Sequence, residues 1–254
     1  MEKYSLYKGE IELCFDEKKH AYTVLGEYVP SATQILGVIN KPALLAWAVN
    51  CAIEFLKRVF KAGRAYDEIE ILDMLEEAKG AHRKKKEKAA DIGTLAHDWC
   101  EKYIKAILNH QPDPEPLVNE QARNCCQAFT KWVSENNVAF IKSERKIYSK
   151  LWKYAGTLDI EAIVNGKRCI CDLKTGSGIY DEYFMQVASY AEALREEEGT
   201  KFEELIIINI KKDGELETKS SDEITRHFNG FLGAKIVWTW MDQNKKHKQI
   251  QEAA

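Results

Sequence analysis

An Asn165-Gly166 dipeptide between two alternating runs constrains this chain more than any other short segment. Asn-Gly between alternating, β-branched segments is the strongest short-range signal of a β-hairpin with a two-residue loop. With that loop, Val164 pairs with Lys167, and counting outward places Asp159 directly opposite Asp172. Cross-strand partners have Cβ atoms about 5 Å apart and share one face of the sheet. The sequence therefore predicts two carboxylates side by side.

Lys174 belongs to the same predicted face, because side chains alternate along a strand. The opposite face reads as core and carries Ile160, Ala162, Val164, Cys169, Cys171 and Leu173. Two neighbouring carboxylates repel, and a hard divalent cation would compensate them. The lysine would then add positive charge where a scissile phosphate and an attacking water would lie. The alternative is a solvated strand face on which Lys174 neutralises an incidental acid pair.

Four segments in order carry a family resemblance. Gly156-x-x-Asp159 followed by Asp172-Leu-Lys174 resembles the signature of the PD-(D/E)XK nuclease superfamily. Downstream, Gln186-x-x-x-Tyr190 resembles the helix motif of its RecB-like branch, and upstream, Gly93-Thr-Leu-Ala-His97 resembles the histidine motif of that branch. Residues 28–36 and 41–47 resemble the phage exonucleases and the mitochondrial genome-maintenance exonuclease group.

The resemblance implies an α/β (α+β) fold with a restriction-endonuclease-like core. Its central mixed β-sheet would be flanked by helices in the order αβββαβ, after an N-terminal β-hairpin and helical extension. It implies that His97, Asp159 and Asp172 hold Mg²⁺ or Mn²⁺, with the main-chain carbonyl of Leu173 as a further ligand. Lys174 would orient or deprotonate the attacking water.

Four more residues are candidates for supporting this site. Glu101 follows His97 by one helical turn and either binds metal through a water or pairs with Lys105. Glu144 matches an acidic position on the strand before the Gly-x-x-Asp strand, and the sequence leaves open whether it reaches the site. The resemblance implies that Gln186 and Tyr190 orient the lysine or the DNA backbone. The alternative is that they belong to the ordinary polar face of a helix, with the tyrosine half-buried.

The resemblance implies a metal-dependent deoxyribonuclease, favoured as an exonuclease acting on DNA ends in recombination, repair or replication. Its substrate would be DNA that is single-stranded or has free ends, and a recombination partner such as a single-strand annealing protein is expected. Two alternatives stay open: a structure-selective or nicking endonuclease with the same site, and a catalytically silent nucleic-acid-binding module.

The net charge of −3 does not by itself indicate a nucleic-acid-binding protein. DNA binding needs only a local basic surface, and the candidate is the run Arg83, Lys84, Lys85 and Lys86. Its position just before the histidine motif favours contacts to the DNA backbone. The alternative is a solvated helix face.

Cysteine usage and hydropathy favour a cytoplasmic protein, and the resemblance to phage exonucleases implies a bacterial or phage-infected cell. The seven cysteines have no C-x-x-C spacing, which favours reduced thiols. No cysteine follows Cys171, so we expect no iron–sulfur cluster of the kind that some RecB-like nucleases hold. No apolar run approaches the ~20 residues that span a bilayer, and the N-terminus lacks an apolar signal region.

Three regions are expected, in one compact unit. Residues 1–90 form the N-terminal extension, a candidate lid or arch; residues 91–242 form the nuclease core; residues 243–254 form a basic tail. The extension contains a hairpin over 11–29, a capping-box helix from Ser31 to near Gly37, a helix over 42–61 and a helix over 66–90 broken near Gly80. Within the core, helices are expected over 91–109, 117–136, 181–197 and 222–242, and strands over 138–148, 202–210 and 215–219, in addition to the hairpin. Residues 111–116 form a proline-rich linker.

Overall fold

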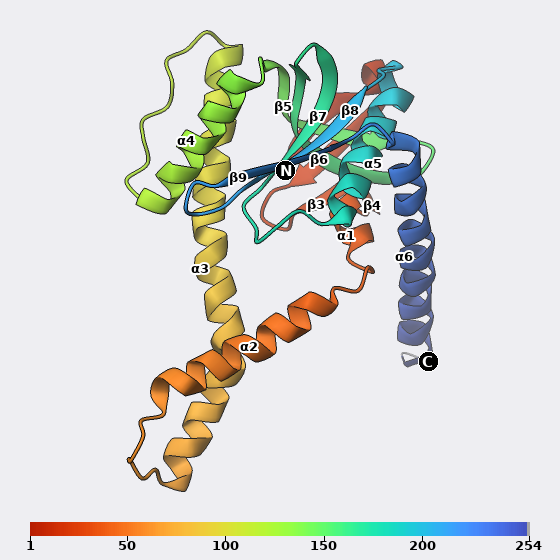
Figure 1. Ribbon diagram of the computed structural model, residues 1–254. Coiled ribbons are helices and arrows are strands. Elements are labelled where there is room, and N and C mark those ends of the chain that lie inside the picture. The colour runs from red at the N-terminus through yellow and green to blue at the C-terminus, as the bar shows by residue number, and fades with distance from the viewer. Residues whose placement is uncertain (253–254) are drawn as a thin grey trace. The chain divides into compact units, whose positions relative to one another are not determined.

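A computed structural model describes residues 1–252 of the chain. The chain divides into two compact units, of which unit 1 comprises Met1–Ile39 and Ala96–Ala254 and unit 2 comprises Asn40–Leu95. The N-terminal strands therefore belong to the same unit as the predicted nuclease core. Figure 1 shows the elements of both units in chain order by colour.

The larger sheet of unit 1 is the predicted mixed sheet. Its strands, in spatial order, are β5 (Ala139–Ser149), β6 (Tyr154–Val164), β7 (Lys167–Lys174), β8 (Glu204–Ile210) and β9 (Leu216–Ser221). Strands β7 and β8 run parallel, and the other neighbours are antiparallel. A parallel pair needs a crossover connection, which here contains α5 (Asp181–Glu198). The α/β fold with the order αβββαβ is thus confirmed.

Helices cover both faces of this sheet (Figure 1). Helices α5 and α6 (Ile224–Glu252) pack on one face, where residues such as Val187 and Phe231 join the core. The other face is covered by α4 (Glu120–Glu135) and by the part of α3 (Glu68–Leu108) that belongs to unit 1. The predicted apolar face of the hairpin lies in this second core, as Ile160, Ala162, Val164, Cys169, Cys171 and Leu173. The alternation that defines two faces of the hairpin is confirmed.

The Asn-Gly turn sets the register of β6 and β7. Val164 pairs with Lys167 as predicted, and both Asn165 (φ 49°) and Gly166 (φ 85°) have the positive φ of a type I′ turn. The ladder of paired residues runs outward only as far as Ile160 and Cys171. Asp159 and Asp172 follow immediately after this last pair, so they are adjacent to the ladder but are not themselves paired in it.

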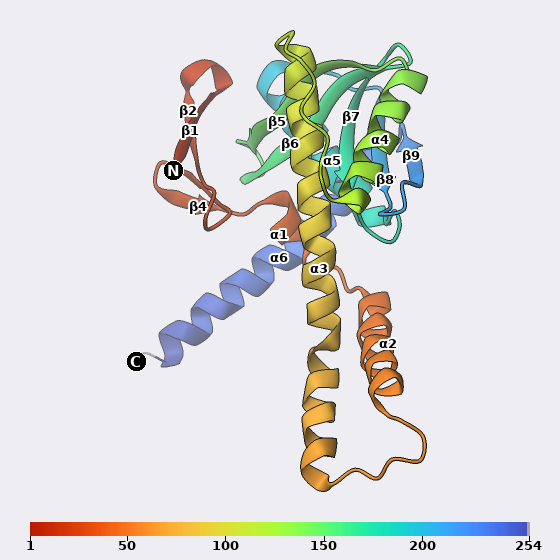
Figure 2. The same ribbon diagram turned by 90° about the vertical axis from the view of Figure 1, so that its left-hand side faces the viewer.

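The N-terminal residues form a second, four-stranded antiparallel sheet. Its strands are β1 (Glu2–Leu6), β2 (Ile11–Asp16), β3 (Ala21–Val24) and β4 (Glu27–Val29). The predicted hairpin over 11–29 is confirmed, while β1 was not foreseen. Figure 2 shows this sheet beside the end of β5 and β6. The capping box of Ser31 and Gln34 is also confirmed, and it begins α1 (Ala32–Leu36).

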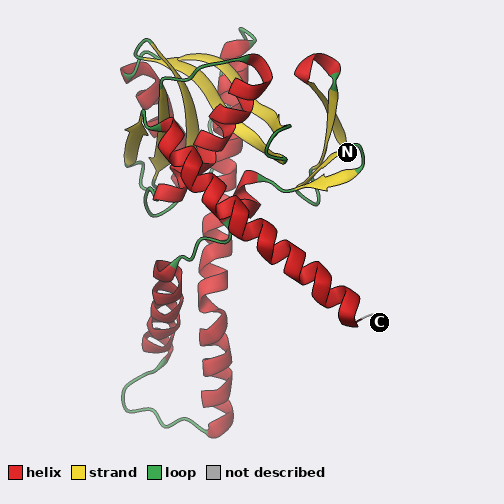
Figure 3. Cartoon of the chain, turned by 90° about the vertical axis from the view of Figure 1, so that its right-hand side faces the viewer, coloured by secondary structure: helices red, strands yellow, loops and turns green. Residues whose placement is uncertain are grey.

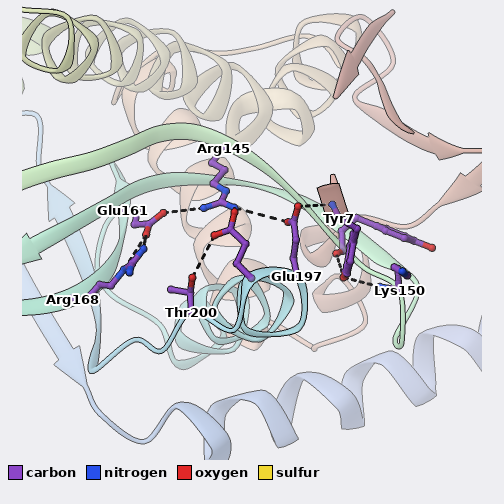
Figure 4. Close-up of polar contacts among 9 residues, drawn as sticks. Tyr7, Arg145, Lys150, Glu161, Arg168, Glu197 and Thr200 are labelled. Carbon is purple, nitrogen blue, oxygen red and sulfur yellow. Dashed lines mark hydrogen bonds and ion pairs between the residues drawn. The ribbon is translucent and has the colours of Figure 1, made fainter. Parts of the chain in front are cut away.

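Polar contacts join the N-terminal sheet to the larger sheet and to α5 (Figure 4). The Tyr7 hydroxyl donates to the main-chain oxygen of Tyr148 on β5 (3.0 Å), and the Tyr7 amide donates to Glu197 Oε1 on α5 (2.8 Å). Beside them, Arg145 Nη1 lies 3.3 Å from the fully buried Glu161, whose other oxygen accepts from Arg168 Nε (3.1 Å). The Tyr7 contacts tie the N-terminal segment to β5 and α5, and the Glu161 contacts link β5, β6 and β7 to one another.

Unit 2 contains α2 (Pro42–Val59) and the N-terminal part of α3. The helix over 42–61 is confirmed, but the break near Gly80 is wrong: α3 is continuous through Gly80 and into the predicted histidine-motif helix (Figure 3). A glycine costs a helix about 1 kcal/mol relative to alanine, which weakens the helix without ending it. Between residues 68 and 108 there is no proline to enforce a break.

The last helix is longer than predicted. α6 continues to Glu252, so residues 243–252 of the predicted tail are helical, and residues 253–254 lie outside the described part of the chain. Across residues 1–252, the structure contains no helix with the length and hydropathy required to cross a membrane.

Candidate functional site

Asp159 lies at the point where β6 and β7 stop pairing. Its Oδ2 accepts a hydrogen bond from the main-chain N–H of Leu173 (2.9 Å), so a side-chain oxygen takes an amide that a backbone carbonyl would otherwise take. The same oxygen lies 3.3 Å from His97 Nε2 on α3. This side-chain contact explains why the ladder ends one residue short of the two aspartates.

Three side chains from three elements form a candidate metal site. His97 on α3, Glu144 on β5 and Asp159 on β6 each offer a ligand atom, and these atoms lie within 4.8 Å of one another. One imidazole and two carboxylates suit Mn²⁺ or Mg²⁺, which prefer oxygen ligands, with imidazole favouring Mn²⁺. The question that the sequence left open for Glu144 is thus answered: it reaches His97 and Asp159.

The backbone at Glu144 has an uncommon conformation for a strand residue. Its φ is 51°, in the left-handed region that costs a non-glycine residue about 1–2 kcal/mol. Residues held in such conformations cluster at functional sites. No sequence pattern signals this local turn of the strand, which is why the position of Glu144 could not be decided beforehand.

The electrostatics of the three residues fit a cation. Burial, together with the neighbouring Asp159, raises the pKa of Glu144 to about 7. The hydrogen bond to Asp159 raises the pKa of His97 to about 9, against the opposing effect of burial. Burial would raise the pKa of Asp159, but His97, Lys174 and the Leu173 amide together lower it. A metal ion would take the place of the protons that Glu144 and His97 otherwise retain.

Asp172 has different partners from Asp159. It is 1% exposed, its Oδ1 accepts from Gln186 Nε2 on α5 (3.4 Å), and its Oδ2 lies 2.5 Å from Lys174 Nζ. Burial and the charge of Asp159 raise its pKa to about 6, despite the opposing effect of Lys174. Among the described residues, the cluster of metal-ligating atoms does not include Asp172, so its expected ligand role stays a prediction.

Lys174 is held as a cation. Burial lowers its pKa, but the charges of Asp172 and Asp159 outweigh this and raise it overall. Its Nζ also lies 5.0 Å from the centre of the Tyr183 ring, a cation–π contact. The side chain is therefore oriented both by Asp172 on its own strand and by an aromatic ring of α5.

Gln186 and Tyr190 lie one helical turn apart on α5 and link the site to Gly156. Gln186 Nε2 donates to the Tyr190 hydroxyl oxygen (2.9 Å) as well as to Asp172. A Cβ added at Gly156 would lie only 2.5 Å from Tyr190 Cε1, so the ring packs directly on the glycine backbone. Glycine is required here because of this close approach, not because of its φ.

These residues line one cavity of unit 1, with a volume of about 660 Å³. His97, Glu144 and Asp159 contribute to its lining together with Gln186 and Tyr190. The N-terminal sheet and its turn supply further lining residues, both aromatic and acidic: Glu2, Tyr4, Phe15, Glu17, His20 and Tyr22. The Tyr22 hydroxyl lies 2.7 Å from Thr157 Oγ1 on β6, which connects the two sheets.

Other candidate residues lie apart from the three-residue group. Glu101 lines the cavity but forms an ion pair with Lys105, the alternative foreseen for it. Leu173 contributes its amide to Asp159, and the role expected for its carbonyl stays a prediction. The basic run over residues 83–86 is exposed and belongs to unit 2, where Lys85 pairs with Glu54.

Two polar residues near the site escaped the sequence analysis. Asn209 on β8 is fully buried next to Lys174, and its Oδ1 accepts from the Gly176 amide (3.0 Å). Its position as the one polar residue in the apolar run of residues 205–210 could have marked it as a candidate site residue. Lys146 on β5 lines the cavity from a position two residues after Glu144. Its sequence gave no signal, because it stands in an ordinary mixed run of charged and apolar residues.

In comparisons with known proteins, this chain shows similarity only to solved structures, and that similarity is weak. No protein-family model matches this chain, and no curated protein sequence matches it. A candidate exonuclease from Eubacterium rectale is 14% identical with a TM-score of 0.38, and the match covers 57% of this chain and 64% of that one. An alkaline exonuclease from Laribacter hongkongensis is 9% identical with a TM-score of 0.27, covering 82% of this chain and 99% of that one.

Proposed function

We propose that this protein is a metal-dependent nuclease that hydrolyses phosphodiester bonds in DNA. The observation that carries the proposal is the convergence of His97, Glu144 and Asp159, with ligand atoms within 4.8 Å, beside the buried pair of Asp172 and Lys174. Carboxylates and an imidazole in one cavity, with a lysine close enough to influence the charge of Asp159, match what phosphodiester hydrolysis requires. They provide a metal site and a separate cation for the charge that develops on phosphate.

His97, Glu144 and Asp159 would hold Mg²⁺ or Mn²⁺, and Asp172 and the Leu173 carbonyl are proposed as further ligands. When bound, the cation polarises the scissile phosphate and lowers the pKa of a bound water. His97 must lose its proton to become a ligand, so metal binding strengthens as the pH rises toward its pKa of about 9.

Lys174 acts on the phosphate as a cation and hydrogen-bond donor. Its raised pKa favours this role over that of a general base, because a base must first release its proton. Gln186 holds Asp172 through Oδ1, and Tyr190 holds Gln186, so these two residues orient the carboxylate that pairs with Lys174.

An exonuclease acting on free DNA ends is the preferred form of this activity. It rests on the resemblance of the motifs around His97, Asp159, Asp172 and Gln186 to RecB-like nucleases, and of residues 28–47 to the exonuclease groups. By the same resemblance we propose a cytoplasmic role in recombination, repair or replication, with residues 1–90 as an extension of the nuclease core over 91–242.

Circular and linear DNA, single- and double-stranded, tested with and without Mn²⁺, distinguish the candidate activities. An exonuclease degrades linear DNA and spares circles, an endonuclease also cuts circles, and a binding module shifts mobility without cutting. Chelator should abolish cleavage, and Mg²⁺ or Mn²⁺ should restore it. Persistent cleavage by a highly purified Asp172→Ala protein would show that the activity belongs to another site or to a contaminant.

Two further variants separate the roles within the site. Lys174→Ala should still bind Mn²⁺, observed by electron paramagnetic resonance, yet turn over poorly. His97→Ala should raise the metal concentration needed for half-maximal activity and reduce any preference for Mn²⁺ over Mg²⁺. Wild-type metal dependence in His97→Ala, combined with easier unfolding, would assign His97 a structural role instead.

A further inference from the structure

Lys146 extends from β5 into the cavity and meets the N-terminal sheet. Its Nζ lies 4.6 Å from the centre of the Phe15 ring and 5.7 Å from that of Tyr4. Phe15 is itself packed against Tyr22, with ring centres 4.8 Å apart. The aromatic side of the N-terminal sheet thus fixes an ammonium group on the wall of the cavity.

This ammonium group has no carboxylate partner among the described residues, although the cavity is rich in acids. The other lysines near the site are paired: Lys105 with Glu101 and Lys174 with Asp172. Lys146 is only partly exposed, and burial lowers its pKa. The charges of Glu144, Glu2 and Glu101 oppose that effect, but none of these carboxylates forms an ion pair with it. Cation–π contacts orient a charge without neutralising it, which leaves the group able to bind an anion.

Lys146 lines the same cavity as the metal site. It follows Glu144 by two positions on β5, and both residues belong to the cavity lining. The two groups are close enough for each charge to shift the pKa of the other. A nucleic acid strand bound at the metal site would therefore bring a neighbouring phosphate into reach of Lys146. We propose that Lys146 binds the phosphate next to the one that is cut, and that the N-terminal sheet serves to hold it there. This inference rests on the proposed nuclease function.

The first test compares two lysines of the same strand. Lys146→Met keeps the apolar stem on the rings and removes the charge, while Lys142→Met removes an exposed charge four positions earlier that does not line the cavity. With a short single-stranded DNA and Mg²⁺, Lys146→Met should lower kcat/KM about tenfold, mainly through KM. Lys142→Met should leave both constants close to those of the wild type.

The second test identifies the phosphate. A single uncharged methylphosphonate is placed at successive linkages around the cleaved one, and kcat/KM is measured for each substrate. The wild type should lose about tenfold when the linkage next to the cleaved one is neutralised. Lys146→Met should lose nothing further at that linkage but should keep the wild-type sensitivity at the others. Lys146→Arg, which retains the charge, should behave as the wild type.

The inference is overturned if Lys146→Met cuts as well as the wild type, or if its sensitivity to methylphosphonate is unchanged at every linkage. If Lys146→Met melts at a lower temperature than the wild type, Lys146→Gln carries the same expectations. A wild-type protein that neither binds nor cuts DNA would instead refute the proposed function, and the inference with it. The two failures are distinguishable because only the second affects the unmodified protein.

Discussion

Single atoms decide the chemistry of this site. Asp159 Oδ2 serves both the Leu173 amide and His97, while Asp172 uses one oxygen for Gln186 and directs the other to Lys174. Two aspartates adjacent in the fold therefore have opposite pKa shifts: that of Asp159 is lowered and that of Asp172 is raised to about 6. The partners of each carboxylate, rather than the residue type, set its proton affinity.

Replacing Gly156 by alanine should disrupt this arrangement through Tyr190. The new methyl group would lie 2.5 Å from the ring, so the ring must move and pull Gln186 away from Asp172. We expect a loss of about 1–3 kcal/mol in the free energy of unfolding and at least a tenfold loss of nuclease activity. Gly178→Ala is the matched control, because no atom lies within 4 Å of its added Cβ. Equal activity of the two variants would contradict the proposed role of the Tyr190–Gln186 contact.

The raised pKa of Glu144 predicts the pH dependence of stability in the metal-free protein. Between its ordinary pKa of 4.5 and about 7, the folded state binds more protons than the unfolded state, so stability falls as the pH rises. Asp172 acts in the same direction up to about pH 6. Glu144→Gln should remove on the order of 2 kcal/mol of this fall. Urea unfolding at pH 5 and pH 7.5 with chelator measures it, and an unchanged slope in the variant would contradict the assignment.

At the scale of elements, the site depends on where strands and helices end or continue. The ladder of β6 and β7 stops at Ile160 and Cys171, and this exposes the two aspartates that follow. Helix α3 continues without interruption from Glu68 to Leu108, so His97 projects from an intact helix rather than from a helix terminus. A ligand on a continuous helix is held more precisely than one at a fraying end.

Helix α3 should be stabilised by Gly80→Ala. The added Cβ would meet only Arg83 Nη2 at 3.7 Å, which is ordinary contact, and alanine is the better helix former by about 1 kcal/mol. Gly63→Ala is the control, because Gly63 has a φ of +78° that strains any other residue, and it should destabilise. Thermal melting compares the two. A lower melting temperature for Gly80→Ala would support the helix break near Gly80 that the sequence suggested.

At the scale of the whole molecule, the candidate metal site and the exposed basic run belong to different units. The cavity of unit 1 contains Glu144 and Asp159, whereas the basic run over residues 83–86 is exposed on unit 2. A net charge of −3 therefore coexists with a local basic surface on unit 2. Under the proposed function, unit 1 would hydrolyse the DNA and unit 2 would add affinity for DNA that does not depend on its sequence.

Charge reversal at Lys84 and Lys86 should weaken DNA binding and reduce its salt dependence, because fewer counterions are released on binding. The slope of log K against log salt should fall by about two. Reversal at Lys102 and Lys201, exposed lysines of unit 1, is the control and should change affinity much less. Fluorescence anisotropy at several salt concentrations provides the measurement. If both pairs behave alike, the run over 83–86 is only a solvated helix face.

Local sequence patterns predicted most elements and much of the register. Asn165 and Gly166 specify a type I′ turn, alternation then assigns every hairpin residue to a face, and the capping box of Ser31 and Gln34 begins α1. These features depend on residues within a few positions of one another, so local preferences suffice to predict them. The predicted pairing of Asp159 with Asp172 lies just beyond the end of the ladder, because Asp159 Oδ2 accepts the Leu173 amide. Alternation and turn type do not reveal such a side-chain contact.

Which side chains meet at the site depends on tertiary packing. Glu144 joins His97 and Asp159 because β5 pairs with β6 and turns at a left-handed residue, and Lys146 is oriented by rings more than 120 positions earlier in the chain. The requirement for glycine at position 156 comes from the close approach of Tyr190, which lies on another element. Such contacts are set by how the sheets and helices pack, and packing depends on the whole chain at once. Local sequence patterns therefore do not predict these contacts.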